Sequence, residues 1–205
     1  MADYLLSFDP GIINMSYCLV EIKTNTIIRW GLFSIKDNTN EGSCTRLAKQ
    51  LDDLKLLVIP NWTSETRPRV IIVHELQPRC NVKTLVISGQ LIMYFVLEKF
   101  GMEITSQTAV IQKVVGFAAK NKLKYYEFLE GDAPLCVDHL KKGHYRNKQL
   151  SKQHCDRILR RTNSPWLKFF QDNKAKQDDI ADAFLQCLAY IKNNKLISGL
   201  EANHL

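Results

Sequence analysis

Four acidic residues in three short motifs are the side chains of this sequence best suited to chemistry. Asp9 and Glu75 each end a short apolar run that reads as a β-strand, and Asp179 and Asp182 lie three residues apart near the C-terminus, on one face of an expected helix. Carboxylate oxygens are the ligands that Mg²⁺ and Mn²⁺ prefer. Two such ions roughly 4 Å apart can drive phosphodiester hydrolysis without a covalent nucleophile. The pattern therefore favours a metal-dependent nuclease.

The C-terminal acidic pair has a second interpretation and an internal ambiguity. Acidic residues in a first helical turn stabilise the helix dipole without binding any ion, and Asp178 also shares a helix face with Asp182. The apolar positions of this helix border Asp179 and Asp182 more closely than Asp178, so we expect the first two to face inward. A carboxylate at the end of a buried strand is costly without a compensating cation, so the addition of Asp9 and Glu75 favours the metal site.

The basic residues of the chain are concentrated in one segment. The net charge is +7, and residues 141–161 hold eight Lys or Arg residues against one acid, Asp156, so this segment alone carries +7. A basic element beside an acidic metal site suggests a polyanionic partner, because phosphates need local countercharge. A solvated helix face is the simpler alternative.

Length and composition indicate one domain in an intracellular protein. For 205 residues we expect a single domain over residues 1–195 and a flexible tail over 196–205. The six cysteines are scattered without a Cys-x-x-Cys pair, which favours reduced thiols in the cytosol or nucleus. The start of the sequence has no secretory pattern, and the longest apolar run, Ile87–Val96, is interrupted and too short for a bilayer. We therefore expect no membrane partner.

Apolar periodicity and turn residues predict a mixed five-stranded sheet flanked by helices, an α/β architecture. If the strands that end in Asp9 and Glu75 are parallel neighbours, their carboxylates meet at one edge of the sheet. The predicted strands are Tyr4–Asp9, Met15–Lys23, Thr26–Ile35, Val70–Glu75 and Glu103–Thr105, and the predicted helices are Cys44–Leu57, Lys83–Phe100, Ser106 to about Lys120, Lys148–Arg161 and Gln177–Asn194.

Three segments resemble the motifs of the RuvC-type Holliday junction resolvases, and most closely the branch found in poxviruses and other large DNA viruses. They are Ser7–Asn14, Glu75–Arg79 and Lys176–Phe184, and the resemblance runs from about residue 4 to residue 192. It implies an RNase H-like fold, a homodimer, and Mg²⁺-dependent cutting of four-way DNA junctions. If the chain is viral, the resemblance implies the host cytoplasm or the viral replication site. Where relatives often have Glu-Arg-Gln, this chain has Glu-Leu-Gln, and it is longer between residues 121 and 145.

The resemblance also assigns roles to individual residues. The family's four acids, catalytic and metal-ligating, fall on Asp9, Glu75, Asp179 and Asp182, with two ions per site and no small-molecule cofactor. The family's basic residue near the site falls on Lys148, with Lys152 as the second candidate. The residues expected to contact branched DNA are Arg79, Lys113, Lys141, Lys142, Arg146 and Lys152.

The helix predicted over Lys83–Phe100 is a candidate dimer seam. It is apolar almost throughout, which leaves apolar surface beyond one contact with the sheet. A junction needs nicks in two opposing strands, and a two-fold homodimer supplies one active site for each. Glu at Ile92, Tyr94 or Phe95 would reveal which face meets the partner.

Three other functions are compatible with parts of the pattern. An RNase H-like enzyme acting on RNA–DNA hybrids would use the same acids. A non-catalytic junction-binding protein would not need all four of them. An actin-like or sugar-kinase-like ATP-binding module also begins with a strand and Asp-x-Gly, but it needs two lobes, and this chain has room for one.

Overall fold

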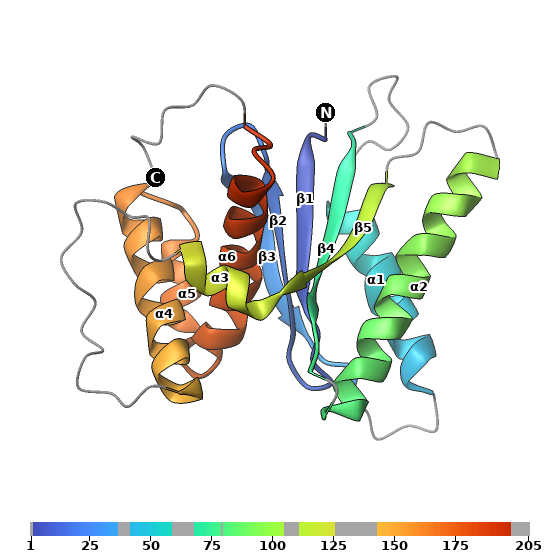
Figure 1. The fold of residues 1–205 in the computed structure, drawn as a ribbon, viewed down its shortest axis with the longest axis horizontal. Coiled ribbons are helices and arrows are strands. Elements are labelled where there is room, and N and C mark those ends of the chain that lie inside the picture. The colour runs from blue at the N-terminus through green and yellow to red at the C-terminus, as the bar shows by residue number, and fades with distance from the viewer. Residues whose placement is uncertain are drawn as a thin grey trace.

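The computed structural model describes residues 2–36, 42–58, 68–78, 80–104, 111–125 and 143–197. These residues form a five-stranded sheet in the order β3-β2-β1-β4-β5 (Figure 1). β1 is antiparallel to β2, β2 is antiparallel to β3, and β4 is parallel to both β1 and β5. The predicted mixed sheet is confirmed. Its strands are β1 (Tyr4–Asp9), β2 (Met15–Glu21), β3 (Thr26–Phe33), β4 (Val70–Leu76) and β5 (Ile111–Ala118).

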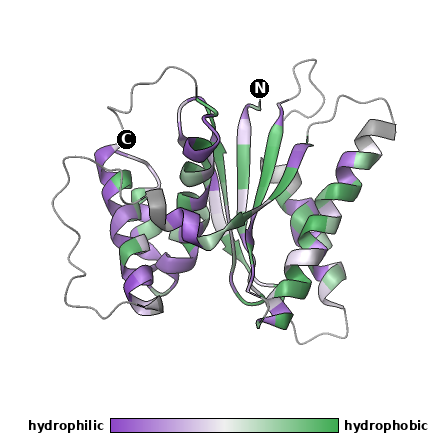
Figure 2. Ribbon diagram, viewed as in Figure 1, coloured by the Kyte–Doolittle hydropathy of each residue, from purple (hydrophilic) through white to green (hydrophobic). Residues whose placement is uncertain are grey.

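Helices cover both faces of the sheet (Figure 1). One face carries α1 (Ser43–Val58) and α2 (Val82–Ile104). The other carries α3 (Ala119–Tyr125), α4 (His144–Arg161), α5 (Leu167–Asp172), the short 3-10 helix η2 (Lys174–Lys176) and α6 (Gln177–Asn193). Figure 2 shows the apolar strands between these two layers, as the burial of both sheet faces requires.

The side chains of β1 alternate between the two cores. Leu5 packs in the core on the α6 side, whereas Leu6 and Phe8 pack in the core on the side of α1 and α2. Because alternate residues of a strand point to opposite faces, Asp9 points to the same side as Leu5, toward α6. The alternation of side chains along β1 thus places Asp9 on the face of the sheet that α6 covers.

The fifth strand is not where the sequence predicted it. Residues 103 and 104 are the last turn of α2, and β5 occupies Ile111–Ala118, where the sequence predicted a helix from Ser106 to about Lys120. The segment holds Ile111, Val114 and Val115, which favour a strand, and pairing with β4 is the tertiary contact that selects it. Gly101, directly after the predicted end of the preceding helix at Phe100, lies inside α2.

Residues near the C-terminus extend the core. Leu196 and Ile197 pack against the cluster on the α6 side, and the Leu196 amide donates to the carbonyl of Ile191. Residues 198–205 of the predicted tail lie outside the described residues.

Helix α2 has one inner and one outer apolar side. Ile87, Leu91 and Phe95 are buried against the sheet. By length and composition alone, Val82–Gly101 would be able to cross a membrane, with only 22% of that window buried. Because the inner side is part of the sheet core, we interpret α2 as a sheet-covering helix whose outer apolar side needs a further explanation.

Candidate metal and nucleic-acid site

Two strand ends bring Asp9 and Glu75 together, as the sequence predicted. β1 and β4 are parallel neighbours, and Phe8 pairs with His74, so the next residue of each strand is one of the two acids. The loop after β1 is tight, because a Cβ on Gly11 would lie 2.5 Å from the carbonyl oxygen of Asn14. Glycine at this position allows the chain to turn directly after Asp9.

Hydrogen bonds to the sheet fix the first half of α6 above these strand ends. Gln186 Nε2 donates to the carbonyl of Phe8 at 3.2 Å, and Ser16 Oγ donates to the carbonyl of Asp179 at 2.6 Å. Trp30 Nε1 donates to the carbonyl of Ile180 at 2.9 Å. Three neighbouring strands therefore hold α6, and two of them hold the turn that carries the acidic motif.

An aromatic cluster reinforces the same junction. The Trp30 ring stacks on Phe170 with a centroid distance of 5.8 Å and an interplanar angle of 5°, and it contacts Phe184 at 5.5 Å. Trp166, which packs edge-on against Trp30, donates its indole N–H to the carbonyl of Ile27. These rings tie β3 to α5 and α6, so the helix that carries the acids is positioned by a well-packed core.

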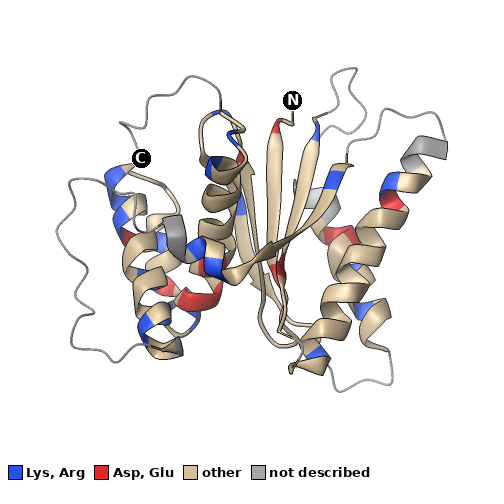
Figure 3. Ribbon diagram, viewed as in Figure 1, with Lys and Arg blue, Asp and Glu red and all other residues tan. Residues whose placement is uncertain are grey.

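The carboxylates of Asp9, Glu75 and Asp182 form a triad, defined here as the three acids whose ligand oxygens all lie within 4.8 Å of one another. Each is half-buried. Figure 3 shows acidic residues at the strand ends and at the start of α6, with basic residues nearby on α3 and α4. Three hard oxygen donors this close together suit a divalent cation such as Mg²⁺ or Mn²⁺.

Lys122, on α3, is the residue of this site that the sequence reasoning missed. Its Nζ donates to the Glu75 carboxylate and lies 3.1 Å from Asp182 Oδ2, and the residue is only 4% exposed. β5 runs parallel to β4, so the helix that follows it begins at the edge of the sheet where Glu75 lies. Recognising 111–118 as a parallel strand would have placed the basic residues after it at this edge.

The charges of the triad determine the protonation of Lys122. Burial lowers the pKa of the Lys122 ammonium, but the carboxylates of Asp182, Asp9 and Glu75 outweigh that effect, and the pKa is raised. The ammonium therefore stays protonated and offsets part of the negative charge.

Asp9 is the acid whose ionisation is most opposed. Burial raises the pKa of its carboxyl well above the usual value, Lys122 lowers it, and the negative charges of Glu75, Asp182 and Asp179 raise it further. A cation bound between these carboxylates would relieve both the burial cost and the mutual repulsion.

Asp179 lies beside the triad but not within it. Its charge raises the pKa of Asp9, so it is close enough to influence the site. Its own pKa is raised, first by burial and then by the charge of Asp178. The structure thus brings three of the four predicted acids together, and a ligand role for Asp179 stays a prediction.

Asp178, which the sequence predicted to face inward less than Asp179 and Asp182, is nevertheless buried, on the side of α6 that meets α4. It is 9% exposed, and Lys148 Nζ lies 2.5 Å from its Oδ2, with Lys152 Nζ at 4.0 Å from its Oδ1. Helix α4 packs along this side of α6, a tertiary contact that the periodicity of α6 alone did not reveal. Burial raises the pKa of Asp178, but its hydrogen bonds and the positive charges of Lys148 and Lys152 together outweigh burial, and the pKa is lowered. Lys148, predicted as the active-site lysine, is thus paired with Asp178 and not with the triad.

Ser151 is a further contact that the sequence did not indicate. Its Oγ donates to Asp182 Oδ1 at 2.8 Å, and the residue is 4% exposed. Ser151 lies one helical turn after Lys148 on α4, so the same helix face reaches Asp178 and Asp182. Helix α4, which contributes no carboxylate to the triad, therefore orients Asp182 through this hydrogen bond.

The remaining candidates for DNA contact lie at different distances from the triad. Lys113 is exposed on β5 and pairs with Ile71, four residues before Glu75, or about 13 Å along the strand. Arg146 is half-buried in the first turn of α4. Arg79, Lys141 and Lys142 lie outside the described residues.

Comparison with known proteins gives matches at the level of structure. No protein-family model and no curated protein sequence matches the chain. The fold is similar to that of the yeast mitochondrial Holliday junction resolvase Ydc2, with a TM-score of 0.55, 17% identity and coverage of 93% of this chain and 78% of that one. The fowlpox virus Holliday junction resolvase matches with a TM-score of 0.51, 17% identity and coverage of 93% and 99%.

A third similar structure is T. thermophilus RuvC in complex with a Holliday junction substrate. It has a TM-score of 0.55 and 7% identity, and the match covers 94% of this chain and 96% of that one. The chain thus has the fold of these structures, and the RNase H-like fold that the sequence predicted is confirmed.

Proposed function

We propose that this protein is a metal-dependent endonuclease that resolves four-way DNA junctions. The observation that carries the proposal is the convergence of Asp9, Glu75 and Asp182 at the carboxyl ends of parallel strands. The structural neighbours of the fold, which are Holliday junction resolvases, support the choice of substrate.

The donor set fits a divalent cation of the Mg²⁺ class, with Mn²⁺ as a substitute. Asp9, Glu75 and Asp182 would hold it, and Lys122 leaves them a formal net charge of −2, which one divalent ion balances. When bound, such an ion would stabilise negative charge on the phosphate oxygens. Asp179, whose charge acts on Asp9, would help to hold a second ion.

Lys122 has a second role in the proposal. As a protonated and buried ammonium in contact with two acids of the triad, it orients their carboxylates. It is also placed to donate to an oxygen of the scissile phosphate once that phosphate reaches the triad. We therefore assign to Lys122 the role that the sequence had given to Lys148.

Cleavage of defined substrates tests the proposal. The purified protein is incubated with a labelled synthetic four-way junction, a linear duplex of the same sequence and an RNA–DNA hybrid, each with Mg²⁺. We expect cleavage of the junction, at least a hundredfold slower in Asp9→Asn. Preferred cleavage of the hybrid would support a ribonuclease of the same fold, and junction binding without cleavage in any divalent ion would support a non-catalytic junction-binding protein.

We also propose that the protein acts as a homodimer through the outer side of α2. Six large apolar side chains are exposed there, at helical spacings that place them along one stripe: Val82, Leu85, Val86, Met93, Leu97 and Phe100. A contiguous exposed apolar stripe of this kind is typical of a protein interface. A second copy is the partner that fits the substrate, because two-fold symmetry supplies two active sites for two opposing strands.

Substitutions on the two sides of α2 test the dimer. Met93 points outward at 57% exposure, whereas Phe95 is 5% exposed in the core. We expect Met93→Glu to give a folded monomer that nicks junctions without paired cleavage, and Phe95→Glu to unfold the protein. Ile28→Glu, at an exposed apolar position on β3, is the control and should remain dimeric. If the unmodified protein is monomeric both free and on junction DNA, the proposed homodimer is wrong.

We further propose a reducing intracellular compartment. Among the described residues Cys18, Cys44, Cys80, Cys155 and Cys187 are free thiols, and three of them are buried in the core. Thiol counting on the denatured protein, isolated from cells in the presence of an alkylating agent, should find no disulfide.

A further inference from the structure

We infer that a groove along α4 binds the sugar–phosphate backbone of one DNA strand as it leaves the scissile position. This inference rests on the proposed function and adds the path of the strand. It also divides the basic segment into residues that meet this strand and residues that do not.

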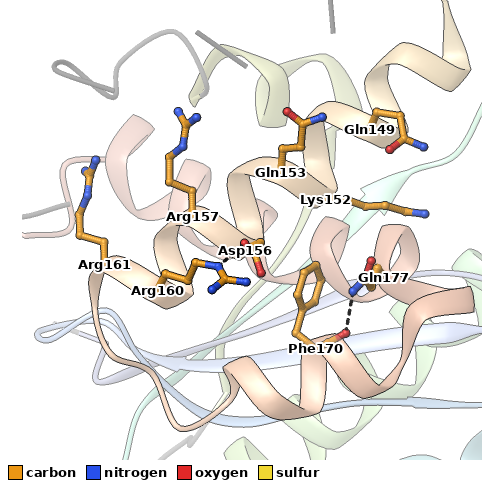
Figure 4. A pocket seen from close by; sticks show the side chains of 9 residues that line it. All are labelled: Gln149, Lys152, Gln153, Asp156, Arg157, Arg160, Arg161, Phe170 and Gln177. Atoms are coloured by element: carbon orange, nitrogen blue, oxygen red, sulfur yellow. Dashed lines mark hydrogen bonds and ion pairs between the residues drawn. The ribbon is translucent and has the colours of Figure 1, made fainter. Parts of the chain in front are cut away.

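The groove lies between α4 on one side and α5 and the start of α6 on the other (Figure 4). It has a volume of about 670 Å³ and is open to solvent, and Phe170 contributes to its floor. The α4 residues that line it recur at intervals of three and four, so they form one face of the helix. They are Gln149, Lys152, Gln153, Asp156, Arg157, Arg160 and Arg161, and Gln177 lines the groove from α6.

The lining is cationic and rich in amides, which suits phosphate. Four Lys or Arg residues line the groove against one acid, Asp156, and that acid is already engaged by Arg160 at 2.6 Å. Figure 4 shows Arg157 and Arg161 extending from α4 side by side, one turn apart. Guanidinium and amide groups contact phosphate oxygens without reading bases. A small-molecule pocket, by contrast, is usually enclosed, whereas this groove is open along its length.

The length of the groove matches several nucleotides. From Lys152 to Arg161 the helix rises about 14 Å, at 1.5 Å per residue. A stacked DNA strand advances about 3.4 Å per nucleotide, so about four nucleotides lie along the basic part of the groove.

One end of the groove adjoins the acidic site. Lys152 lines the groove and also lies 4.0 Å from Asp178 Oδ1. Gln177, on the opposite wall, directly precedes Asp178 in α6, and Ser151, adjacent to Lys152, binds Asp182. A strand whose phosphate lies at the triad therefore passes Lys152 first and continues toward Arg157 and Arg161.

Neutralising the far end of the groove tests the path. We expect the double substitution Arg157→Gln and Arg161→Gln to weaken junction binding at least tenfold near physiological salt and to reduce the slope of log K against log salt by about 2. At saturating junction, the cleavage rate should stay within about threefold of the unmodified protein. The matched control is Lys23→Gln, an exposed cation in the β2–β3 turn, at the end of the sheet opposite the triad, and it should change neither quantity.

Single methylphosphonates in the junction locate the contacts. We expect the unmodified protein to lose affinity when the uncharged group replaces one of about four phosphates on one side of the scissile position. The doubly substituted protein should show no further loss at those phosphates near Arg157 and Arg161. This series on the unmodified protein remains decisive if the double substitution prevents folding.

The possible failures are distinguishable. If the unmodified protein binds and cuts junctions but the double substitution behaves as Lys23→Gln does, the groove inference is wrong and the proposed function stands. The same conclusion follows if no methylphosphonate on that side weakens binding. If the unmodified protein binds junctions with the expected pattern but never cuts them, the proposed nuclease fails while the strand path holds.

Discussion

Replacing Lys122 by Met removes the only positive charge that the described structure places in direct contact with the triad. The Lys122 side chain is 5% exposed, and its partners Glu75 and Asp182 are 14% and 30% exposed. Removing one partner of a buried ion pair typically costs about 3–5 kcal/mol of stability, and we expect the lower end because Asp182 keeps some hydration. At about 2–4 °C per kcal/mol for a chain of this size, the melting temperature of the metal-free protein should fall by about 6–12 °C.

The same substitution should strengthen metal binding. Without Lys122 the three carboxylates hold a formal charge of −3 in place of −2, and one unit charge at about 4 Å is worth on the order of 4 kcal/mol at an effective dielectric constant of 20. After allowance for solvent, we expect Mn²⁺ to bind Lys122→Met at least tenfold more tightly, and saturating Mn²⁺ to restore most of the lost stability. Cleavage should nevertheless fall, because no ammonium remains to meet the phosphate.

Thermal unfolding measures the melting temperature, and titration calorimetry measures the affinity for Mn²⁺. Lys120→Met is the matched control. Lys120 is exposed on the same helix, so its substitution should change the melting temperature little. If Lys122→Met has the same melting temperature as the control, Lys122 is not the countercharge of the triad. The same conclusion follows if saturating Mn²⁺ does not reduce the difference in melting temperature between the two variants.

Three further outcomes follow from contacts around the triad. Ser151→Ala should weaken Mn²⁺ binding several-fold, because it removes a hydrogen bond to a metal ligand, and Ser151→Thr should restore the affinity. If calorimetry gives Ser151→Ala and the unmodified protein equal affinities, the hydrogen bond does not orient Asp182. Asp178→Asn removes the charged partner of Lys148 and should lower the free energy of unfolding, measured by urea denaturation, by about 1–3 kcal/mol. An unchanged free energy of unfolding would contradict the buried ion pair. Burial raises the pKa of Asp9 in the metal-free fold, so its contribution to stability is present at low pH and lost as pH rises through that pKa. At pH 8, metal-free Asp9→Asn should therefore have a higher melting temperature than the metal-free unmodified protein. Near pH 3 the two melting temperatures should be equal. A lower melting temperature for Asp9→Asn at pH 8 would contradict the raised pKa.

The acids on strands were predictable because their position follows from local pattern. Asp9 and Glu75 each follow an apolar run that only a buried strand explains, and a buried parallel pair puts both ends at one edge of the sheet. Asp182 followed from helical spacing and from the family resemblance. None of these inferences required knowledge of a contact between distant segments.

Lys122 and Asp178 were not predictable in the same way. β5 is an edge strand with an irregular burial pattern, and a short apolar segment of this kind does not distinguish strand from helix by periodicity. A helix predicted over this segment leaves Lys122 without a predicted place beside the strand ends. The burial of Asp178 depends on α4 packing beside α6, a tertiary contact that the α6 sequence does not encode.

The rate of cleavage of a labelled four-way junction, measured with Mg²⁺ for the unmodified protein and for Glu75→Gln, tests the metal-nuclease proposal most directly. We expect nicks in two opposing strands near the junction centre that require the ion. Glu75→Gln should be at least a hundredfold slower at equal junction affinity, because it removes a charged ligand without removing any DNA contact. Cleavage that persists in Glu75→Gln, or a junction left intact by the unmodified protein in Mg²⁺ and Mn²⁺ alike, would contradict the proposal.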